Sequence, residues 1–160
     1  MTRKGSDRML ATNEEMQRMD LRAVEEGHVS MVQLMKQAAD ALFEALCRRY
    51  GRTCRYGIFC GSGNNGGDGY ALALRMKAEG IPFVICSLRE PCSACARHYA
   101  QLLEESGEKV LELSRYAQAI EAADVLVDAL FGTGLNRTLS GDGALLAAAL
   151  NASGKPIVAV

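Results

Sequence analysis

The sequence contains no tryptophan, and aromatic residues make up only 6% of its 160 residues. Its formal net charge is −1 at pH 7, so it lacks the excess of positive charge with which proteins hold nucleic acid. The shortage of aromatic side chains also removes the surfaces on which unpaired bases stack. Both absences argue against a nucleic-acid partner.

Long apolar runs are absent as well. No stretch reaches the ~20 apolar residues that a membrane-spanning helix needs. The first eight residues are basic, but no apolar core of the signal-peptide type follows them. We therefore expect a cytoplasmic protein with no membrane partner, and its length predicts a single domain, 1–160, with a sizeable core.

The six cysteines do not form the pattern of a disulfide or zinc framework. Only Cys92 and Cys95 have ligand spacing, and no second Cys or His pair stands at the distance of a zinc ribbon. Cys47 falls in a helical pattern, while Cys60 and Cys86 fall in apolar strands, and a buried free thiol behaves as a small hydrophobic side chain. We expect reduced thiols, with a redox pair at Cys92 and Cys95 as the alternative.

A glycine-rich stretch at 61–69, Gly-Ser-Gly-Asn-Asn-Gly-Gly-Asp-Gly, organises the chain. It lies between an apolar run that predicts a strand at 55–60 and an amphipathic segment that predicts a helix at 70–79. Five glycines in nine residues are costly in a regular element, so we predict a sharp turn that a ligand approaches closely. A strand, such a turn and a helix N-terminus together form an anion site.

The side chains of this stretch favour a polar ligand with a cation. The spacing Gly61-x-Gly63-x-x-Gly66 resembles a dinucleotide fingerprint, which alone is a weak signal. Asp68 would repel a triphosphate unless it contacts a cation or a sugar hydroxyl. The amide oxygens of Asn64 and Asn65 are a ligand type that hard cations prefer. The alternative is a structural turn capped by Asx side chains.

Strands and helices alternate along the rest of the chain. Two helices are predicted first, at 12–26 and 30–50, either to cover the sheet or to form a dimer contact. The further elements are strands at 55–60, 83–86, 110–113, 124–130 and 156–160, and helices at 70–79, 92–106, 116–122 and 143–153. This alternation with apolar strands indicates a parallel sheet covered on both faces. We predict the order 3-2-1-4-5, which puts the loops after strands one and four side by side.

A second polar segment follows the fourth predicted strand. Asp128 lies near the end of that strand, where an unpaired carboxylate in apolar surroundings would be costly. A cation held jointly with Asn65 would remove that cost, and Asp128 is also the best-placed carboxylate for acid–base work. Gly-Thr-Gly at 132–134 would let a phosphate approach, and Arg137 would pair with it. The alternatives are a carboxylate that caps the turn and an arginine in solvent.

The two motifs together resemble one known family. The stretch at 61–69 and Val-Asp-Ala-Leu-Phe-Gly-Thr-Gly-Leu-Asn-Arg at 127–137 are similar to motifs of the YjeF N-terminal domain family, which comprises the NAD(P)H-hydrate epimerases. Met19-Asp20 and Leu34-Met35 fall where that family has Met-Asp and Leu-Met-Glu-Asn-Ala-Gly. The resemblance extends from about residue 14 to residue 160.

The resemblance implies a Rossmann-like three-layer α/β/α sandwich with a mainly parallel sheet, preceded by two N-terminal helices. It implies an isomerase that interconverts the R and S epimers of NADHX and NADPHX, which are hydrated at C6 of the nicotinamide ring. A partner dehydratase, in bacteria commonly fused to this domain, then restores the cofactor. The resemblance also implies K⁺ binding and a homodimer.

Functional positions carry over residue by residue. The resemblance implies that Asn65 and Asp128 ligate K⁺, and Asp128 is the candidate catalytic carboxylate within this chain. It implies that the first motif contacts the substrate and that the second holds its phosphates through backbone N–H groups. The implied substrate-binding residues are Asn64, Asn65, Gly66, Gly67, Asp68, Gly132, Thr133, Gly134, Leu135, Asn136, Arg137 and Thr138.

The sequence departs from the family at three points. Thr138 stands where the family usually has Pro, and Lys36-Gln37 replace Glu-Asn. Family members also continue into an Asp-Ile-Pro-Ser-Gly segment, whose Asp binds substrate and is the main catalytic carboxylate and whose Ser binds K⁺. This sequence stops at Val160. We therefore expect a fragment without the C-terminal part of the family domain, whose apolar edge strand makes it poorly soluble, dimeric or inactive.

Two other functions stay open from the sequence. A non-catalytic nucleotide-binding or protein-interaction module would use the same fold, because function lies in the site. A nucleotide kinase is the third hypothesis, since the dehydratase partner is kinase-like. The sequence has no Walker loop, which argues against the kinase.

Overall fold

The computed structural model describes residues 15, 18–19, 22, 24–27, 29–133, 135 and 138–160. The chain divides into two units, Met1–Leu34 and Met35–Val160, and each is described by itself. In the first unit residues 15, 18–19, 22 and 24–25 are helical, in agreement with the helix predicted at 12–26. Gly27 follows with a φ of +72°, as expected for a helix C-cap. The other residues of that predicted helix lie outside the described ones.

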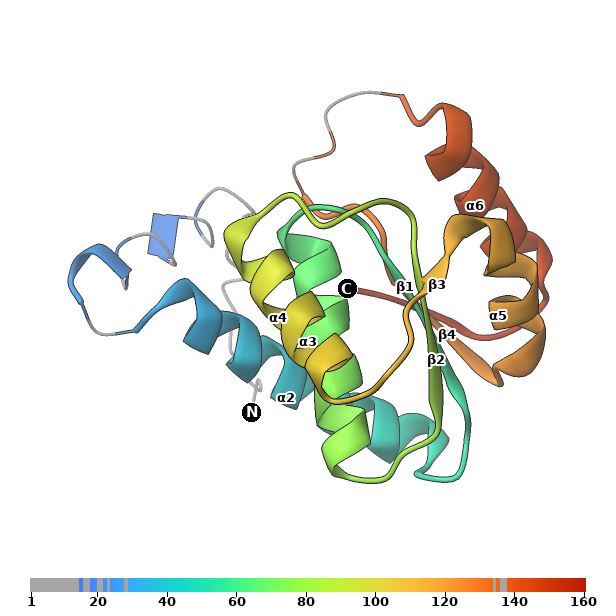
Figure 1. Cartoon of the computed structure of the whole chain (residues 1–160), viewed down its shortest axis with the longest axis horizontal. Coiled ribbons are helices and arrows are strands. Elements are labelled where there is room, and N and C mark those ends of the chain that lie inside the picture. Colours follow the sequence, from blue (N-terminus) through green and yellow to red (C-terminus); the bar gives the residue numbers. More distant parts are fainter. Residues whose placement is uncertain are drawn as a thin grey trace, which may run out of the picture. The chain divides into compact units, whose positions relative to one another are not determined.

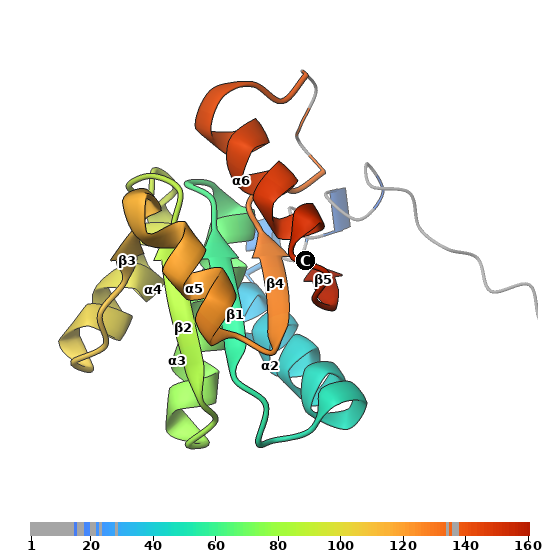
Figure 2. The ribbon, with the colours of Figure 1, turned by 90° about the vertical axis from the view of Figure 1, so that its right-hand side faces the viewer.

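The second unit is a parallel sheet between two layers of helices (Figure 1). Its strands are β1 (Tyr56–Cys60), β2 (Phe83–Ser87), β3 (Leu111–Glu112), β4 (Val125–Ala129) and β5 (Ile157–Ala159). The four strand pairs are parallel, and Figure 2 shows the order β3-β2-β1-β4-β5. The predicted strand order and the predicted Rossmann-like architecture are therefore confirmed.

The helices cover both faces of this sheet (Figures 1 and 2). They are α2 (Met31–Tyr50), α3 (Asn64–Ala78), α4 (Ala94–Glu105), α5 (Tyr116–Ala122) and α6 (Gly141–Ala152), with a 3₁₀ turn, η1 (Leu113–Arg115), before α5. The part of α2 from Met35 onward lies with α3 and α4 on one side, and α5 and α6 lie on the other. None of the described helices has both the length and the apolar character that a membrane crossing requires.

The central strand β1 is buried on both faces, as expected in a parallel sheet between helices. Ile58 and Cys60 point toward α3, where both come close to Gly69. Phe59 points the other way and packs in one cluster with Leu126 of β4 and other residues from α5 and α6. The alternation along the strand thus builds two cores, one under each helix layer.

The prediction of a glycine-rich loop over 61–69 and a helix from residue 70 was wrong. Helix α3 begins at Asn64, so the turn after β1 is only three residues long, 61–63. Glycine usually destabilises a helix, and for this reason the five glycines predicted a loop. Here glycine lies inside the helix because neighbouring segments leave no room for a side chain.

Three glycines of α3 allow this close approach. A Cβ on Gly66 would lie 1.9 Å from the carbonyl oxygen of Gly61, and one on Gly69 would lie 2.6 Å from the Sγ of Cys60. A Cβ on Gly67 would lie 2.7 Å from the Sδ of Met35 in α2. The helix therefore packs directly on the end of β1, and its N-terminus reaches the carboxyl edge of the sheet.

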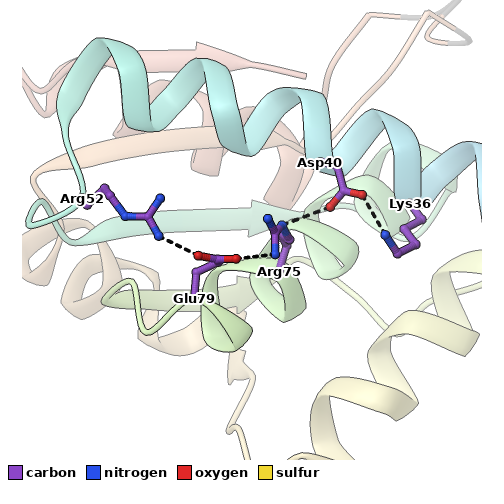
Figure 3. Close-up of polar contacts among 5 residues, drawn as sticks. All are labelled: Lys36, Asp40, Arg52, Arg75 and Glu79. Atoms are coloured by element: carbon purple, nitrogen blue, oxygen red, sulfur yellow. Dashed lines mark hydrogen bonds and ion pairs between the residues drawn. The ribbon is translucent and has the colours of Figure 1, made fainter.

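A chain of ion pairs joins α2 to α3 (Figure 3). Asp40 of α2 contacts Lys36 Nζ at 2.8 Å and Arg75 Nε at 3.1 Å. Glu79 contacts Arg75 Nη1 at 2.6 Å and Arg52 Nη2 at 2.7 Å. The hydrogen bond from Arg52, followed by the charge of Arg75, lowers the pKa of Glu79. These pairs fix α3 against α2 at the end of the helix that lies away from the glycine-rich turn.

The side chain of Lys155 caps the C-terminal end of α5. The Nζ of Lys155 donates hydrogen bonds to the carbonyl oxygens of Ile120, Glu121 and Ala123 at 2.6, 2.9 and 2.5 Å. Carbonyl groups at a helix C-terminus have no partner within the helix and carry the negative end of its dipole. Lys155 therefore satisfies them and ties the segment before β5 to α5.

Replacing Lys155 with methionine should destabilise the chain by about 2 kcal/mol, because three carbonyl groups lose a charged donor and two of these hydrogen bonds are partly buried. Methionine keeps most of the length of the side chain. Urea unfolding followed by circular dichroism measures the change. The matched control is Lys109→Met, at an exposed lysine, for which we expect less than about 0.5 kcal/mol. Equal losses in the two variants would contradict this account.

Candidate functional site

The site lies where β1 and β4 end side by side. Cys60 is in register with Ala129, and the N–H of Gly61 donates to the carbonyl of Ala129 at 2.9 Å. A Cβ on Gly61 would lie 1.9 Å from the carbonyl oxygen of Leu130, so the two chain segments touch as they leave the sheet. After β1 the chain continues to β2, and after β4 it continues to β5 on the opposite side. This is the switch point at which parallel sheets bind ligands.

The first turn of α3 supplies backbone donors at this point. Its N-cap, Gly63, has an extended backbone and makes no side-chain cap hydrogen bond. The N–H of Gly67 donates to Gly63 at 3.1 Å, so the preceding N–H groups of the helix have no partner within it. The first turn contains no acidic residue. The positive end of the helix dipole therefore faces the switch point without a capping carboxylate.

Asn65 connects the first motif to the second. A Cβ on Gly132 would lie 3.1 Å from the Oδ1 of Asn65, so the two residues approach closely. The Nδ2 of Asn65 is buried and has no hydrogen-bond partner among the described residues. A buried amide without a partner costs about 1–3 kcal/mol, and a polar ligand or water would relieve that cost.

Asp128 lies in β4 between Phe59 of β1 and Ala159 of β5. It is half-buried, and its Oδ1 accepts a hydrogen bond from the N–H of Leu130 at 3.0 Å. The carboxylate thus caps the start of the turn after β4, while the Oδ2 of Asp128 takes no part in that hydrogen bond. No hydrogen bond among the described residues joins Asp128 to Asn65 directly.

The structure places the other predicted substrate-binding residues in two groups. In α3, Asn64 is exposed, Asp68 is half-buried, and Gly66 and Gly67 are buried. After β4, three described residues are exposed and Gly132 is half-buried; the exposed ones are Thr133, Leu135 and Thr138. The N–H of Leu135 donates to Gly132 at 3.2 Å. Gly134, Asn136 and Arg137 lie outside the described residues.

The atoms at the site that could bind a metal ion are oxygen atoms rather than sulfur or imidazole nitrogen atoms. In the part of the chain that the structure describes, no three His, Cys, Asp or Glu side chains gather as metal ligands. All six cysteines are free, and burial raises the pKa of Cys60 beside the glycine-rich turn. A cation at this edge would therefore be held by amide, carboxylate or backbone oxygens, which suit hard ions.

The segment after β2 was not considered in the sequence interpretation. Ser-Leu-Arg-Glu-Pro at 87–91 follows the strand next to β1, and the N–H of Leu88 donates to the carbonyl of Cys60 at 2.8 Å. The N–H of Cys92 donates to the carbonyl of Ser62 at 2.7 Å. The signal that could have pointed to this segment was its polar run directly after the strand predicted at 83–86.

Fold and strand order together define the class of the protein: a parallel α/β domain with a candidate ligand site where its first and fourth strands end. The sequence matches the family described as YjeF-related protein N-terminus over residues 31–160. The chain belongs to this family, as the two motifs predicted.

Several known proteins are similar to this chain. The NAD(P)H-hydrate epimerase of Rhodobacter capsulatus is 30% identical, over 94% of this chain and 74% of its own length. The bifunctional NAD(P)H-hydrate repair enzyme Nnr of Vibrio cholerae is 35% identical, over 93% of this chain and 30% of its own. The crystal structure of the yeast protein ynu0 has a TM-score of 0.82 and 21% identity, over 94% of this chain and 69% of its own. This last likeness confirms the fold.

Proposed function

We propose that the chain is an NAD(P)H-hydrate epimerase, an isomerase that interconverts the R and S epimers of NADHX and NADPHX. The observation that carries the proposal is the 30% identity, over 94% of this chain, to a protein of that name. Similarity to bifunctional NAD(P)H-hydrate repair enzymes supports a role in repair of the nicotinamide cofactors.

The geometry of the switch point supports substrate binding there. The uncapped first turn of α3 presents backbone donors and a positive dipole to an anionic dinucleotide. In this proposal residues 64–68 contact the substrate, and residues 132–138 hold its phosphates through backbone N–H groups. The close approach of Asn65 to Gly132 supports a single site made from both motifs.

Epimerisation requires that a bond at C6 of the ring is broken and remade on the other face. Either the C6–N1 bond opens to an aldehyde, or the hydroxyl leaves as water and water returns. In both routes a proton leaves one oxygen or nitrogen atom and is later returned, which is the work of a general acid–base group. We propose Asp128 for this role, through the Oδ2 that lies outside the bond to Leu130.

We further propose that Asn65 and Asp128 hold K⁺. The donor set fits, because the Oδ1 of Asn65, which lies close to Gly132, and the carboxylate of Asp128 are both oxygen ligands. When bound, K⁺ supplies positive charge beside the substrate phosphates and the carboxylate.

The K⁺ proposal predicts a salt-specific stabilisation. In 100 mM KCl the chain should melt about 3–6 °C higher than in 100 mM choline chloride, because a tenfold excess over Kd contributes about 1.4 kcal/mol. Choline keeps the ionic strength equal. Differential scanning fluorimetry measures the shift, which we expect to disappear in Asp128→Asn. A shift of the same size in that variant would count against the site.

We also propose that an NAD(P)H-hydrate dehydratase acts on the same substrates, that the chain works in the cytoplasm, and that it forms a homodimer. Relatives named bifunctional repair enzymes support the first of these. Size-exclusion chromatography with light scattering tests the last, for which we expect twice the mass of one chain.

Turnover of a defined epimer tests the proposed function. R-NADPHX is incubated with the chain in K⁺ buffer, and the ratio of epimers is followed by chromatography against a protein-free sample. We expect the ratio to reach equilibrium faster with the protein. Binding of the nucleotide without any acceleration would instead support the non-catalytic module.

A further inference from the structure

A groove of about 600 Å³ opens beside the carboxyl end of β2. The segment after β2, the helix α4 and the edge strand β3 line it, with Leu88, Ala100 and Leu111 among its apolar residues. Its size is that of a small-molecule site. None of the residues assigned to the site at β1 and β4 lines this groove.

A chain of hydrogen bonds fixes the backbone at the mouth of the groove. The hydroxyl of Tyr70, on α3, donates to Ser87 Oγ at 2.9 Å, and Ser87 Oγ donates to the carbonyl of Arg89 at 2.6 Å. Burial raises the pKa of Tyr70, so this hydroxyl stays protonated. The helix whose N-terminus forms the first site therefore also positions Arg89.

The side chain of Arg89 is available to a ligand. It is 66% exposed, and its Nη2 lies 4.0 Å from the Oδ2 of Asp142, which is 60% exposed. An exposed ion pair at this distance contributes little to stability, so a phosphate can replace the carboxylate. Arginine also matches the geometry of phosphate oxygens.

The groove and the switch point lie on neighbouring strands of one sheet edge. β1 and β2 end together, with Cys60 in register with Ser87. The segment that follows Ser87 returns to the glycine-rich turn, where the N–H of Cys92 donates to Ser62. An extended dinucleotide bound at α3 would therefore run toward the groove.

The lining carries charges of both signs. Arg89 and Arg97 supply donors for an anion, and Glu90, Glu104 and Glu112 supply acceptors. A simple anion would find these carboxylates unfavourable. A ligand that combines a phosphate with hydroxyl and amino donors uses both kinds of group, and adenosine phosphates have this combination.

We infer that this groove binds the adenosine half of the dinucleotide substrate, and that Arg89 contacts the 2′-phosphate that distinguishes NADPHX from NADHX. The inference rests on the proposed function. In dinucleotide-binding sheets an acidic residue near the end of the second strand takes the ribose 2′-hydroxyl, and a nearby arginine takes a 2′-phosphate. Arg89 and Glu90 lie two and three residues after the end of β2, so the chain binds both forms and favours the phosphorylated one.

Binding of two fragments tests the role of Arg89. Adenosine 2′,5′-bisphosphate and 5′-AMP are titrated calorimetrically into the full chain, the variant Arg89→Ala and the control Arg48→Ala, at an exposed arginine of α2 outside the groove. We expect Arg89→Ala to weaken the bisphosphate about tenfold or more, because a charge-assisted contact is lost, and 5′-AMP less than twofold. Equal effects on the two fragments, or no effect on either, would overturn the assignment.

The place of binding is tested separately by amide chemical shifts. The bisphosphate should shift the backbone amides of groove residues such as Leu88, Gln101 and Leu111. Shifts confined to residues 61–69 and 128–133 would overturn the groove as the adenosine site.

The ratio of kcat/KM for NADPHX to that for NADHX separates this inference from the proposed function. We expect Arg89→Ala to lower this ratio about tenfold. If the unmodified chain epimerises both substrates and the variant leaves the ratio unchanged, the groove assignment fails and the proposed function stands. If the unmodified chain is inactive but binds the bisphosphate in the groove, the proposed function fails and the adenosine site stands.

Discussion

Replacing Gly66 with alanine should abolish the native fold. The new Cβ would lie 1.9 Å from the carbonyl oxygen of Gly61, a backbone atom that cannot rotate away. To relieve the overlap, α3 would have to move off β1, which would open the core around Gly69 and Cys60. We expect a loss of more than about 4 kcal/mol, beyond the usual range for a single substitution.

The matched control lies in the same glycine-rich stretch. Gly63 has an extended backbone, and a Cβ there would meet nothing within 4 Å. Gly63→Ala should therefore cost only about 1 kcal/mol, because alanine is a poorer N-cap residue than glycine. Urea unfolding and soluble yield compare the two variants. A stable Gly66→Ala protein, or equal losses in both, would show that close packing is not why glycine stands in this helix.

The variant Asp128→Asn should lose epimerase turnover by about 10²-fold or more, because an amide cannot carry the proton. Its fold should persist, since the amide oxygen still accepts the hydrogen bond from Leu130. The affinity for NADP⁺, measured for both proteins in choline chloride without K⁺, should change less than about threefold, which would place the loss in kcat rather than in binding.

Asp124→Asn is the control for this variant, with the same substitution at the residue just before the same strand begins. Asp124 is exposed, and its Oδ2 accepts a hydrogen bond from the N–H of Arg55, which asparagine can also accept. We expect its turnover to match that of the unmodified chain. If Asp128→Asn keeps full activity while its NADP⁺ affinity is normal, Asp128 is not the acid–base group.

The strand order of the sheet could be predicted from the sequence, because it depends on the apolar periodicity of each segment and on the right-handed crossovers between parallel strands. When apolar strands are separated by helices, only a few strand orders allow every crossover connection to be right-handed, and the order β3-β2-β1-β4-β5 is one of them. The short helix at 116–122 was predicted with its observed bounds. The start of α3 was predicted wrongly, because the contacts that require Gly66 and Gly67 come from the preceding turn and from α2.

The candidate site was predictable to the level of its two motifs. Both motifs lie at the carboxyl edge because β1 and β4 are parallel neighbours. The contact between Asn65 and Gly132 joins residues 67 positions apart, and no local pattern encodes such a contact. The groove beside β2 was missed for the same reason, since α3, α4 and β3 all contribute to it.

An NMR titration of the labelled chain with R-NADPHX tests most directly whether it is an epimerase with its site at the ends of β1 and β4. The spectra report the backbone amides that shift and the growth of the S epimer in the same sample. The account predicts shifts in the first turn of α3 and at residues 128–133, with the S epimer appearing faster than in a protein-free sample. Shifts that leave both segments unchanged, or an S epimer that forms no faster than without protein, would contradict it.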